Sequence, residues 1–524
     1  MHITDLSPAS EGLCGYPYST MGSLDTSEYS WTEVRPGRWE RDIDEAEQFY
    51  TTIAKTYEGS GRCCFAITGY ITFSAPGSEE EVEAALRRAW VQLRYEHPTI
   101  ASTVEYSEPL LRCRKVYEMA LTPEAQSRWL QSTFRIVRTK LSGLEWCNSD
   151  PPVPALPTMF MIRRPGRGTG MVSADLVLRC RPDVVDGAGT LMLFNNLFTH
   201  AARALAQGDA YPLPVFGDEW NRLSPPLRTA AGVPPVMSKR QQTRLDKTIA
   251  WNAALKQGVE TASLPSRKGT AAKPGKHQRL AITLSAESTH RLLRACNALG
   301  LSVTHAYYTA IGIVLRDMQK RHRRERKVRY INYSLIDERP QCTEPYNSPA
   351  HPASIYHSVS GECLALDLTV PAASIGAPEQ LLDSSIPRRR EFMRIASRVR
   401  RFDLQNRNDK QRVAMAPAYW GMITPAYPVD NSTPAVPTAV KPGMVSLSDL
   451  GTLDDTISPT HGAFELDNPW VTREHLVTGL GLYLGMWNGC LTLSATYNSA
   501  WHTRSEALMF LDRCNVVTIQ ALGA

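Results

Sequence analysis

The stretch between residues 171 and 202 constrains the fold most, because its hydrophobic period changes within a few residues. Residues 171–178 are rich in apolar, β-forming side chains, whereas residues 190–202 repeat apolar side chains at helical spacing. Asp186-Gly187 stands between the two patterns, where glycine is expected to supply backbone freedom. The sequence therefore predicts a strand, a polar corner and then a helix.

Length and composition indicate a large folded protein with more than one core. At 524 residues the chain exceeds one ordinary core and fits two domains of roughly 200 to 260 residues. Hydrophobic residues make up 43% and charged residues 21%, which is the balance of a folded soluble protein. The net charge of +6 is mild for this size and gives no strong reason to expect nucleic acid as a partner.

The sequence also carries no sign of export or of a membrane span. No segment approaches the ~18 consecutive apolar residues that a span requires, and the first residues lack a basic start followed by an apolar run. Eleven cysteines, an odd number without any C-x-x-C, favour free thiols in a reducing compartment. We therefore expect a cytoplasmic protein.

The corner resembles the H-H-x-x-x-D-G signature of the CoA-dependent acyltransferase superfamily. This superfamily includes nonribosomal peptide condensation domains, alcohol acyltransferases and fungal trichothecene O-acetyltransferases, and its second histidine is the general base. Here the two histidines would fall on Arg181 and Pro182, so only Asp186 and Gly187 remain. Because proline has no titratable group, it cannot accept the proton.

Further motifs, in the family's order, extend the resemblance to roughly residues 37–524. They are a helix that ends at His97-Pro98, an Arg339-Pro340 strand exit, a strand end over residues 445–451 with Asp449 in place of asparagine, and a closing strand over residues 489–498. The resemblance implies an α/β fold of two chloramphenicol-acetyltransferase-like lobes that form a V with a tunnel between them. It also implies an ion pair between Asp186 and Arg339 that holds the lobes in register.

Composition shifts suggest how the chain is divided. Residues 1–36 are rich in Ser, Gly, Pro and Thr and are expected to form an irregular arm. Residues 37–220 would form the N-terminal lobe with the corner, and residues 221–277 a polar linker that contains one helix. Residues 278–524 would form the C-terminal lobe.

In this fold the tunnel meets the corner, which gives a set of candidate site residues. The predicted catalytic residues are Asp183, His305 and Tyr497; the predicted substrate-binding residues are Pro182, Ser446, Ser448 and Trp487; the predicted structural residues are Asp186, Gly187 and Arg339. For each proposed wall residue the alternative is an ordinary packing or strand-surface role. A well-paired Asp186 would be a poor proton acceptor, so its role is expected to be structural.

Three other histidines are interpreted as non-catalytic. His97 lies at a helix C-terminus, where it would interact with the last carbonyl groups. His351 and His357 are expected to be surface or loop residues, because no third ligand accompanies them. The sequence therefore predicts no metal site.

The loss of the base leads to a first functional hypothesis. The chain would be a fungal-type secondary-metabolite enzyme repurposed as a cofactor-independent cyclase. It would promote an intramolecular cycloaddition of the Diels-Alder type, or a related ring closure, by holding a flexible substrate in a reactive pose. The expected partner is a small hydrophobic natural product, and the expected state is a monomer because this fold encloses its tunnel within one chain.

Two alternatives remain open. The first is an O-acyltransferase that moves an acyl group from acyl-CoA, for example acetyl-CoA, to a hydroxyl of a terpenoid or polyketide. It would use another base, such as Asp183 or His305, or rely on substrate orientation. The second is a non-catalytic binding or scaffold protein with an inactive site.

Overall fold

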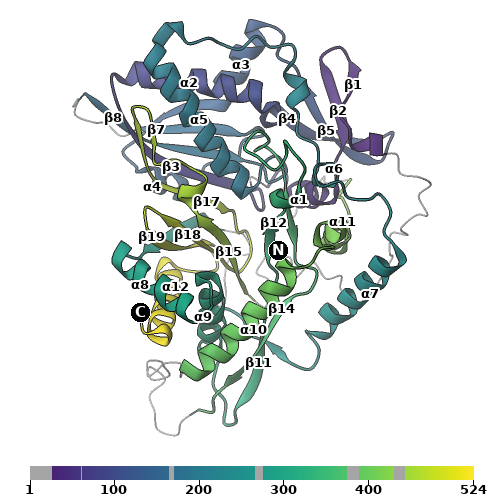
Figure 1. Cartoon of the computed structure of the whole chain (residues 1–524), viewed down its shortest axis with the longest axis vertical. Coiled ribbons are helices and arrows are strands. Elements are labelled where there is room, and N and C mark those ends of the chain that lie inside the picture. Colours follow the sequence, from purple (N-terminus) through teal and green to yellow (C-terminus); the bar gives the residue numbers. More distant parts are fainter. Residues whose placement is uncertain (1–25, 61, 164–169, 266–274, 374–388, 430–442) are drawn as a thin grey trace.

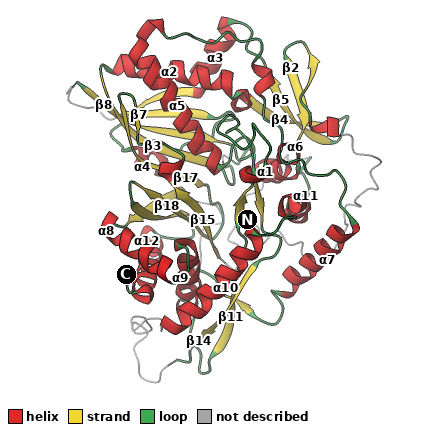
Figure 2. Cartoon of the chain, in the orientation of Figure 1, coloured by secondary structure: helices red, strands yellow, loops and turns green. Residues whose placement is uncertain are grey.

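The computed structural model describes residues 26–60, 62–163, 170–265, 275–373, 389–429 and 443–524. The elements form two lobes, and each lobe has β-sheets of its own (Figure 1). Helices flank the strands of both lobes (Figure 2). The chain is therefore a mixed α/β protein of two lobes, as the motifs predict.

The first lobe contains a six-stranded sheet of order β16-β17-β3-β8-β7-β6. Its strands are β3 (Ile67–Pro76), β6 (Phe134–Arg138), β7 (Thr158–Arg163), β8 (Met171–Cys180), β16 (Thr460–His461) and β17 (Phe464–Arg473). Helices α2 (Glu79–Glu96) and α5 (Gly187–Gln207) cover one face and share a buried hydrophobic core with it. Since β16 and β17 come from late in the chain, this sheet joins distant parts of the sequence.

The other face of this sheet carries a smaller core that includes Tyr70, Phe160 and Trp470. The short helix α4 (Gly143–Asn148) packs there. Asn148 also bonds both backbone groups of Arg279 in the second lobe, at 2.7 and 3.0 Å. This face of the first sheet therefore lies toward the second lobe.

The second lobe contains a four-stranded sheet of order β10-β19-β18-β15 and a three-stranded sheet of order β14-β11-β9. The strands are β9 (Glu260–Thr261), β10 (His277–Thr283), β11 (Arg326–Asn332), β14 (Leu364–Val370), β15 (Met444–Thr452), β18 (Gly479–Trp487) and β19 (Cys490–Asn498). Helices α8 (Ala286–Ala298), α9 (Val303–Asp317), α10 (Arg389–Arg407) and α12 (Arg504–Leu522) share its core.

Two smaller sheets complete the fold. The first has the order β1-β2-β5-β4, and the second pairs β12 with β13. Their strands are β1 (Thr32–Arg35), β2 (Arg38–Asp42), β4 (Ser102–Ser107), β5 (Arg112–Glu118), β12 (Leu335–Asp337) and β13 (His357–Val359). The remaining helices are α1 (Glu45–Thr56), α3 (Pro123–Thr133), α6 (Leu227–Ala230), α7 (Lys239–Ala254) and α11 (Arg412–Ile423).

The structure corrects one expectation about the N-terminal arm. Residues 1–25 lie outside the described residues, but β1 belongs to the end of the arm and pairs with β2. The arm is therefore not irregular throughout, because a Gly37 turn allows a hairpin there. The division of the chain at residues 221–277 and the tunnel between the lobes stay predictions.

Within the described part of the chain, no single helix has the length and apolar character that a membrane crossing requires. The pair α8 and α9, bent by 94°, meets that test only when both helices are taken together, by length and composition.

Candidate functional site

The site begins at the corner between β8 and α5. Asp186 is the N-cap of α5, and its Oδ1 accepts a hydrogen bond of 2.8 Å from the Gly189 backbone. Pro182, which the sequence resemblance aligns with the second histidine of the signature, is buried in the preceding turn. The structure therefore holds no titratable side chain at that position.

Gly187 does not have the role predicted for it. It is the first residue of α5 and is not among the residues with positive φ. A side-chain carbon there would meet only Val471, at 3.5 Å. The expectation that Gly187 supplies backbone freedom is wrong, because the change of direction is completed before the helix begins.

The predicted ion pair between Asp186 and Arg339 is present. The two guanidinium nitrogens Nη2 and Nη1 of Arg339 lie 2.9 and 3.0 Å from the two carboxylate oxygens. Burial acts to raise the pKa of Asp186, but Arg339 and a hydrogen bond from His357 outweigh it and hold the pKa well below its ordinary value. Asp186 is thus a permanent carboxylate that joins the corner to the segment after β12.

His357 is the second partner of this carboxylate. It lies on β13, is 5% exposed, and places Nδ1 3.5 Å from Asp186 Oδ2. On its other side, Nε2 lies 2.8 Å from the hydroxyl of Tyr50 on α1. A carboxylate only accepts, so Nδ1 carries the proton and Nε2 is the hydrogen-bond acceptor.

The charge state of His357 suits a proton acceptor. Burial lowers the pKa of His357 below its ordinary value, Asp186 acts to raise it, and the charges of Arg473 and Arg339 lower it further. The imidazole is therefore neutral near pH 7. A neutral imidazole whose Nε2 accepts a hydrogen bond from a hydroxyl can take up the proton of that hydroxyl and transfer it onward.

Arg473 completes this group at the end of β17. Its Nη1 donates to the Tyr50 hydroxyl at 2.5 Å, and its Nη2 lies 3.3 Å from His357 Nε2. The four residues Asp186, His357, Tyr50 and Arg473, which we call the histidine relay, thus combine a carboxylate, a base, a hydroxyl and a cation. This arrangement can remove a proton and stabilise a developing negative charge on oxygen.

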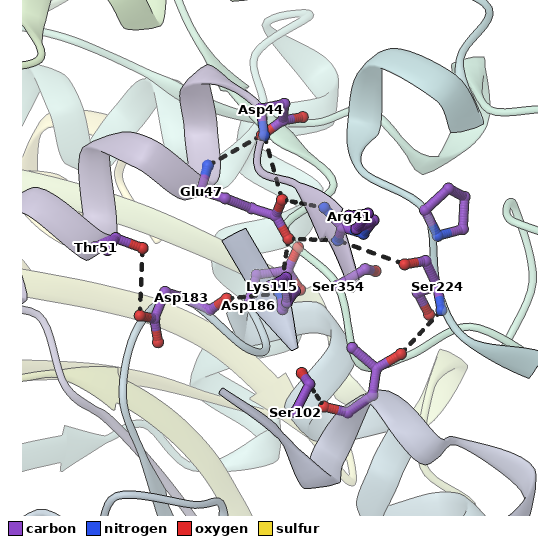
Figure 3. A network of polar contacts seen from close by, with 12 residues as sticks. Arg41, Asp44, Glu47, Thr51, Ser102, Lys115, Asp183, Asp186, Ser224 and Ser354 are labelled. Carbon is purple, nitrogen blue, oxygen red and sulfur yellow. Dashed lines mark hydrogen bonds and ion pairs between the residues drawn. The ribbon is translucent and has the colours of Figure 1, made fainter. Parts of the chain in front are cut away.

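A network of buried charges holds the corner against α1 (Figure 3). Lys115 donates to the carbonyl oxygen of Asp183 at 2.9 Å and to Glu47 at 2.6 Å, and Arg41 binds the same carboxylate with two bonds of 2.7 Å. Thr51 donates to Asp183 Oδ2 at 3.3 Å, one residue along the helix from Tyr50. The predicted catalytic residue Asp183 is therefore held at the corner by Thr51 of α1 and by Lys115.

The other predicted site residues lie elsewhere. His305 belongs to the capping box of α9, where Nδ1 accepts from the Ser302 backbone at 3.0 Å, and Nε2 faces Asp403 at 3.0 Å. Tyr497 is part of the second-lobe core, Trp487 is part of the first-lobe core, and Ser446 and Ser448 are half-buried on β15. Among the described residues, no hydrogen bond or ion pair joins any of these five to the corner.

The sequence interpretation of His357 was wrong, because this residue lies on β13 and is 5% exposed. His351 lies in an irregular segment, as expected, and is 7% exposed. His351 contacts the hydroxyl of Ser224 at 3.2 Å, whereas His357 lies in the histidine relay. No group of three or more His, Cys, Asp or Glu side chains that could hold a metal ion occurs in the described ranges.

Comparison with solved structures shows which known fold the chain has. The trichothecene 15-O-acetyltransferase TRI3 from Fusarium sporotrichioides superposes with a TM-score of 0.74, covering 96% of this chain and 100% of that protein at 14% identity. A condensation domain of the Monacolin K polyketide synthase MokA gives a TM-score of 0.56 over 94% and 98% of the two chains, at 12% identity. The chain has the fold of the CoA-dependent acyltransferase and condensation-domain superfamily, with two chloramphenicol-acetyltransferase-like lobes.

Two curated relatives come from the fungus Monascus ruber. "Acetyltransferase pigO" is 23% identical over 514 residues, which cover 94% of this chain and 98% of the relative. "O-acetyltransferase pigM" is 25% identical over 332 residues, which cover 62% of this chain and 60% of the relative. No protein-family model matches the chain.

Proposed function

We propose that the protein is an O-acyltransferase that moves an acyl group from acyl-CoA to a hydroxyl of a small natural product. The fold of TRI3 and the names of both curated relatives support this reading over the cyclase. The observation that carries it is the histidine relay, which supplies a base beside the corner although Pro182 has replaced the usual one.

The mechanism follows from the order of groups in the relay. As the acceptor hydroxyl oxygen attacks the thioester carbonyl, its proton passes to the Tyr50 oxygen while the Tyr50 proton passes to His357 Nε2. Asp186 stabilises the imidazolium that forms, and Arg473 stabilises negative charge on the reacting oxygens. When the carbon–sulfur bond breaks, the same proton returns through Tyr50 to the departing CoA thiolate.

Turnover measurements on two variants test this proposal. Release of free CoA from acetyl-CoA would be followed with a set of hydroxylated terpenoids and polyketides. We expect His357→Gln to lower kcat by about 10² to 10⁴, the usual contribution of general-base catalysis, with little change in KM. Tyr50→Phe should lower kcat as well, because it removes the hydroxyl through which the proton passes.

A matched variant controls for the loss of a buried histidine. His351→Gln changes a histidine of similar burial that lies outside the relay, so its kcat should stay close to that of the wild type. Melting temperatures of the three variants would confirm that each is folded. If His357→Gln and His351→Gln turn over equally fast, the relay is not the base.

The cyclase is a second candidate function, and Pro182 is the observation that favours it. An enzyme that acts by substrate positioning needs no proton acceptor at the corner. A linear polyene incubated with the protein in the absence of acyl-CoA would then close its ring faster than in buffer. His357→Gln would leave that rate unchanged, which separates the two candidates.

A further inference from the structure

Trp420 on α11 is a buried residue that contacts the histidine relay without belonging to it. It is 1% exposed, and its indole Nε1 donates to the backbone carbonyl oxygen of His357 at 3.3 Å. This hydrogen bond joins the last turn of α11 to the residue of β13 that carries the imidazole of the relay.

The rings of Trp420, His357 and Tyr50 form a nearly equilateral triangle. The Trp420 ring centroid lies 5.7 Å from that of His357 and 5.6 Å from that of Tyr50. The centroids of His357 and Tyr50 are themselves 5.6 Å apart. Aromatic pairs of this kind contribute about 0.5–1.5 kcal/mol beyond the area that they bury. Trp420 therefore packs against both residues between which the proton passes in the proposed mechanism.

Phe49 packs against the same indole and limits its movement. Phe49 is 0% exposed, and its ring centroid lies 5.1 Å from that of Trp420 and 5.1 Å from that of Tyr50. Removal of the indole would leave a void among these rings, and a core relaxes only partly into such a void. The 2.8 Å contact between the Tyr50 hydroxyl and His357 Nε2 would then lose its support on this side.

The backbone of β13 is held by a separate set of contacts. Glu338, which follows β12 and is 0% exposed, accepts a hydrogen bond of 2.5 Å from the Ser358 hydroxyl. Its backbone N–H donates to the carbonyl oxygen of Tyr356 at 2.8 Å. These two bonds fix the neighbours of His357 on either side, so the strand keeps its place when Trp420 is changed.

We infer that Trp420 is a positioning residue that holds the Tyr50 hydroxyl and the imidazole of His357 at hydrogen-bond distance for proton transfer. The inference deepens the proposed function and rests on it, since it concerns the same proton path. A displacement of about 1 Å in a reacting group can lower a rate by about 10². The expected effect is therefore on kcat, whereas KM should change little.

Turnover of acetyl-CoA by two variants measures this effect. Trp420→Leu removes both the ring and the N–H group, so it should lower kcat by about 10 to 10², with KM within about twofold of the wild type. Trp420→Phe keeps an aromatic ring and should recover part of this loss. Trp90→Leu is the matched control, because Trp90 is equally buried and donates its indole N–H to Thr133 at 3.0 Å, in the first-lobe core. Its kcat should stay close to that of the wild type at a temperature where it is folded.

A double variant separates positioning from a general loss of packing. If Trp420 acts through His357, Trp420→Leu should cause no further loss of kcat once His357→Gln has removed the imidazole. Losses that add in the double variant would overturn the inference, and so would an unchanged kcat in Trp420→Leu.

A spectroscopic measurement keeps the inference distinct from the proposed function. In protein labelled with ¹⁵N at histidine, the Nε2 signal of His357, assigned by its absence in His357→Gln, reports the hydrogen bond from Tyr50. Trp420→Leu should shift this signal in the same direction as Tyr50→Phe does, whereas Trp90→Leu should leave it in place. An unchanged signal in Trp420→Leu would show that Trp420 does not hold the contact. If His357→Gln keeps wild-type turnover, the proposed function fails, and this signal still decides whether Trp420 holds the two groups together.

Discussion

Two groups of buried charges can be compared, one at the corner and one where the two lobes meet. Only in the first group is the buried arginine paired with a carboxylate. At the corner, Asp186 meets Arg339 in a two-bond ion pair and also accepts from the Tyr356 backbone at 3.0 Å. In the second group, the side chain of Arg279 on β10 lies over the ring of Trp470, and no carboxylate among the described residues pairs with it. Removing one partner of a buried ion pair leaves the other charge buried and unpaired, whereas removing an unpaired buried charge relieves a desolvation cost.

The largest expected effect comes from removing one arginine from each group. Arg339→Met leaves Asp186 as a buried carboxylate without its main partner, so the free energy of unfolding should fall by about 3–5 kcal/mol. Arg279→Met removes a charge that no carboxylate among the described residues pairs with. The free energy of unfolding should therefore fall much less in this variant, or not at all. Midpoints of urea unfolding would compare the two variants with the wild type, and similar losses would remove the distinction between the groups.

Two carboxylates at the start of α1, the N-cap Asp44 and Glu47, allow the same comparison through the pH dependence of stability, with smaller expected effects. Burial acts to raise the pKa of Glu47, but Arg41 and Lys115 hold it at about 2, whereas burial raises the pKa of Asp44 to about 7. Glu47 therefore stabilises the fold above its ordinary pKa of 4.5, and this is lost as the pH falls toward 2. Asp44 stabilises the fold below its ordinary pKa of 3.8, and this is lost as the pH rises toward 7.

Asp44→Asn isolates the second effect, because asparagine is an equally good helix cap. Between pH 4 and pH 7, the melting temperature of the wild type should fall relative to that of Asp44→Asn, and the two should converge near pH 4. Glu47→Gln should instead be less stable than the wild type at pH 7, because Arg41 and Lys115 lose their partner. A constant difference between wild type and Asp44→Asn across this range would contradict the raised pKa.

The sequence predicts those parts of the fold that depend on a local residue pattern or on the order of motifs along the chain. The capping box of Ser78 and Glu81 is visible as S-x-x-E, and the Asp186–Arg339 pair follows from two motifs in their family order. His305 forms a helix cap with Ser302, and its predicted catalytic role stays a prediction. Local pattern alone does not separate a capping residue from a catalytic one.

The histidine relay could not be predicted in the same way. His357 is 171 residues from Asp186 and 307 residues from Tyr50 in the sequence. No sequence motif near any of the three residues predicts contact with the other two. Arg473 joins them only because β17, from late in the chain, pairs with β3. Contacts of this kind depend on the packing of three separate segments, which a single sequence does not specify.

The two glycines at the start of α5 provide the smallest effect and test how tightly the corner is packed. A side-chain carbon at Gly189 would lie 2.0 Å from the backbone oxygen of Pro352, whereas one at Gly187 would make only an ordinary contact. Gly189→Ala should therefore lower the free energy of unfolding by about 1–3 kcal/mol, because the backbone ahead of His357 must move. Gly187→Ala should be neutral or stabilise by about 0.4–1 kcal/mol, since it lies in a helix.

The same pair of variants links packing at the corner to the histidine relay. The segment that Gly189→Ala displaces leads from Pro352 to Tyr356 and His357, which both contact Asp186. Turnover should therefore fall in Gly189→Ala by more than its loss of stability explains, and it should be unchanged in Gly187→Ala. If Gly189→Ala keeps full turnover at a temperature where it is folded, the relay does not depend on this close contact, and balanced charges alone hold the corner in place.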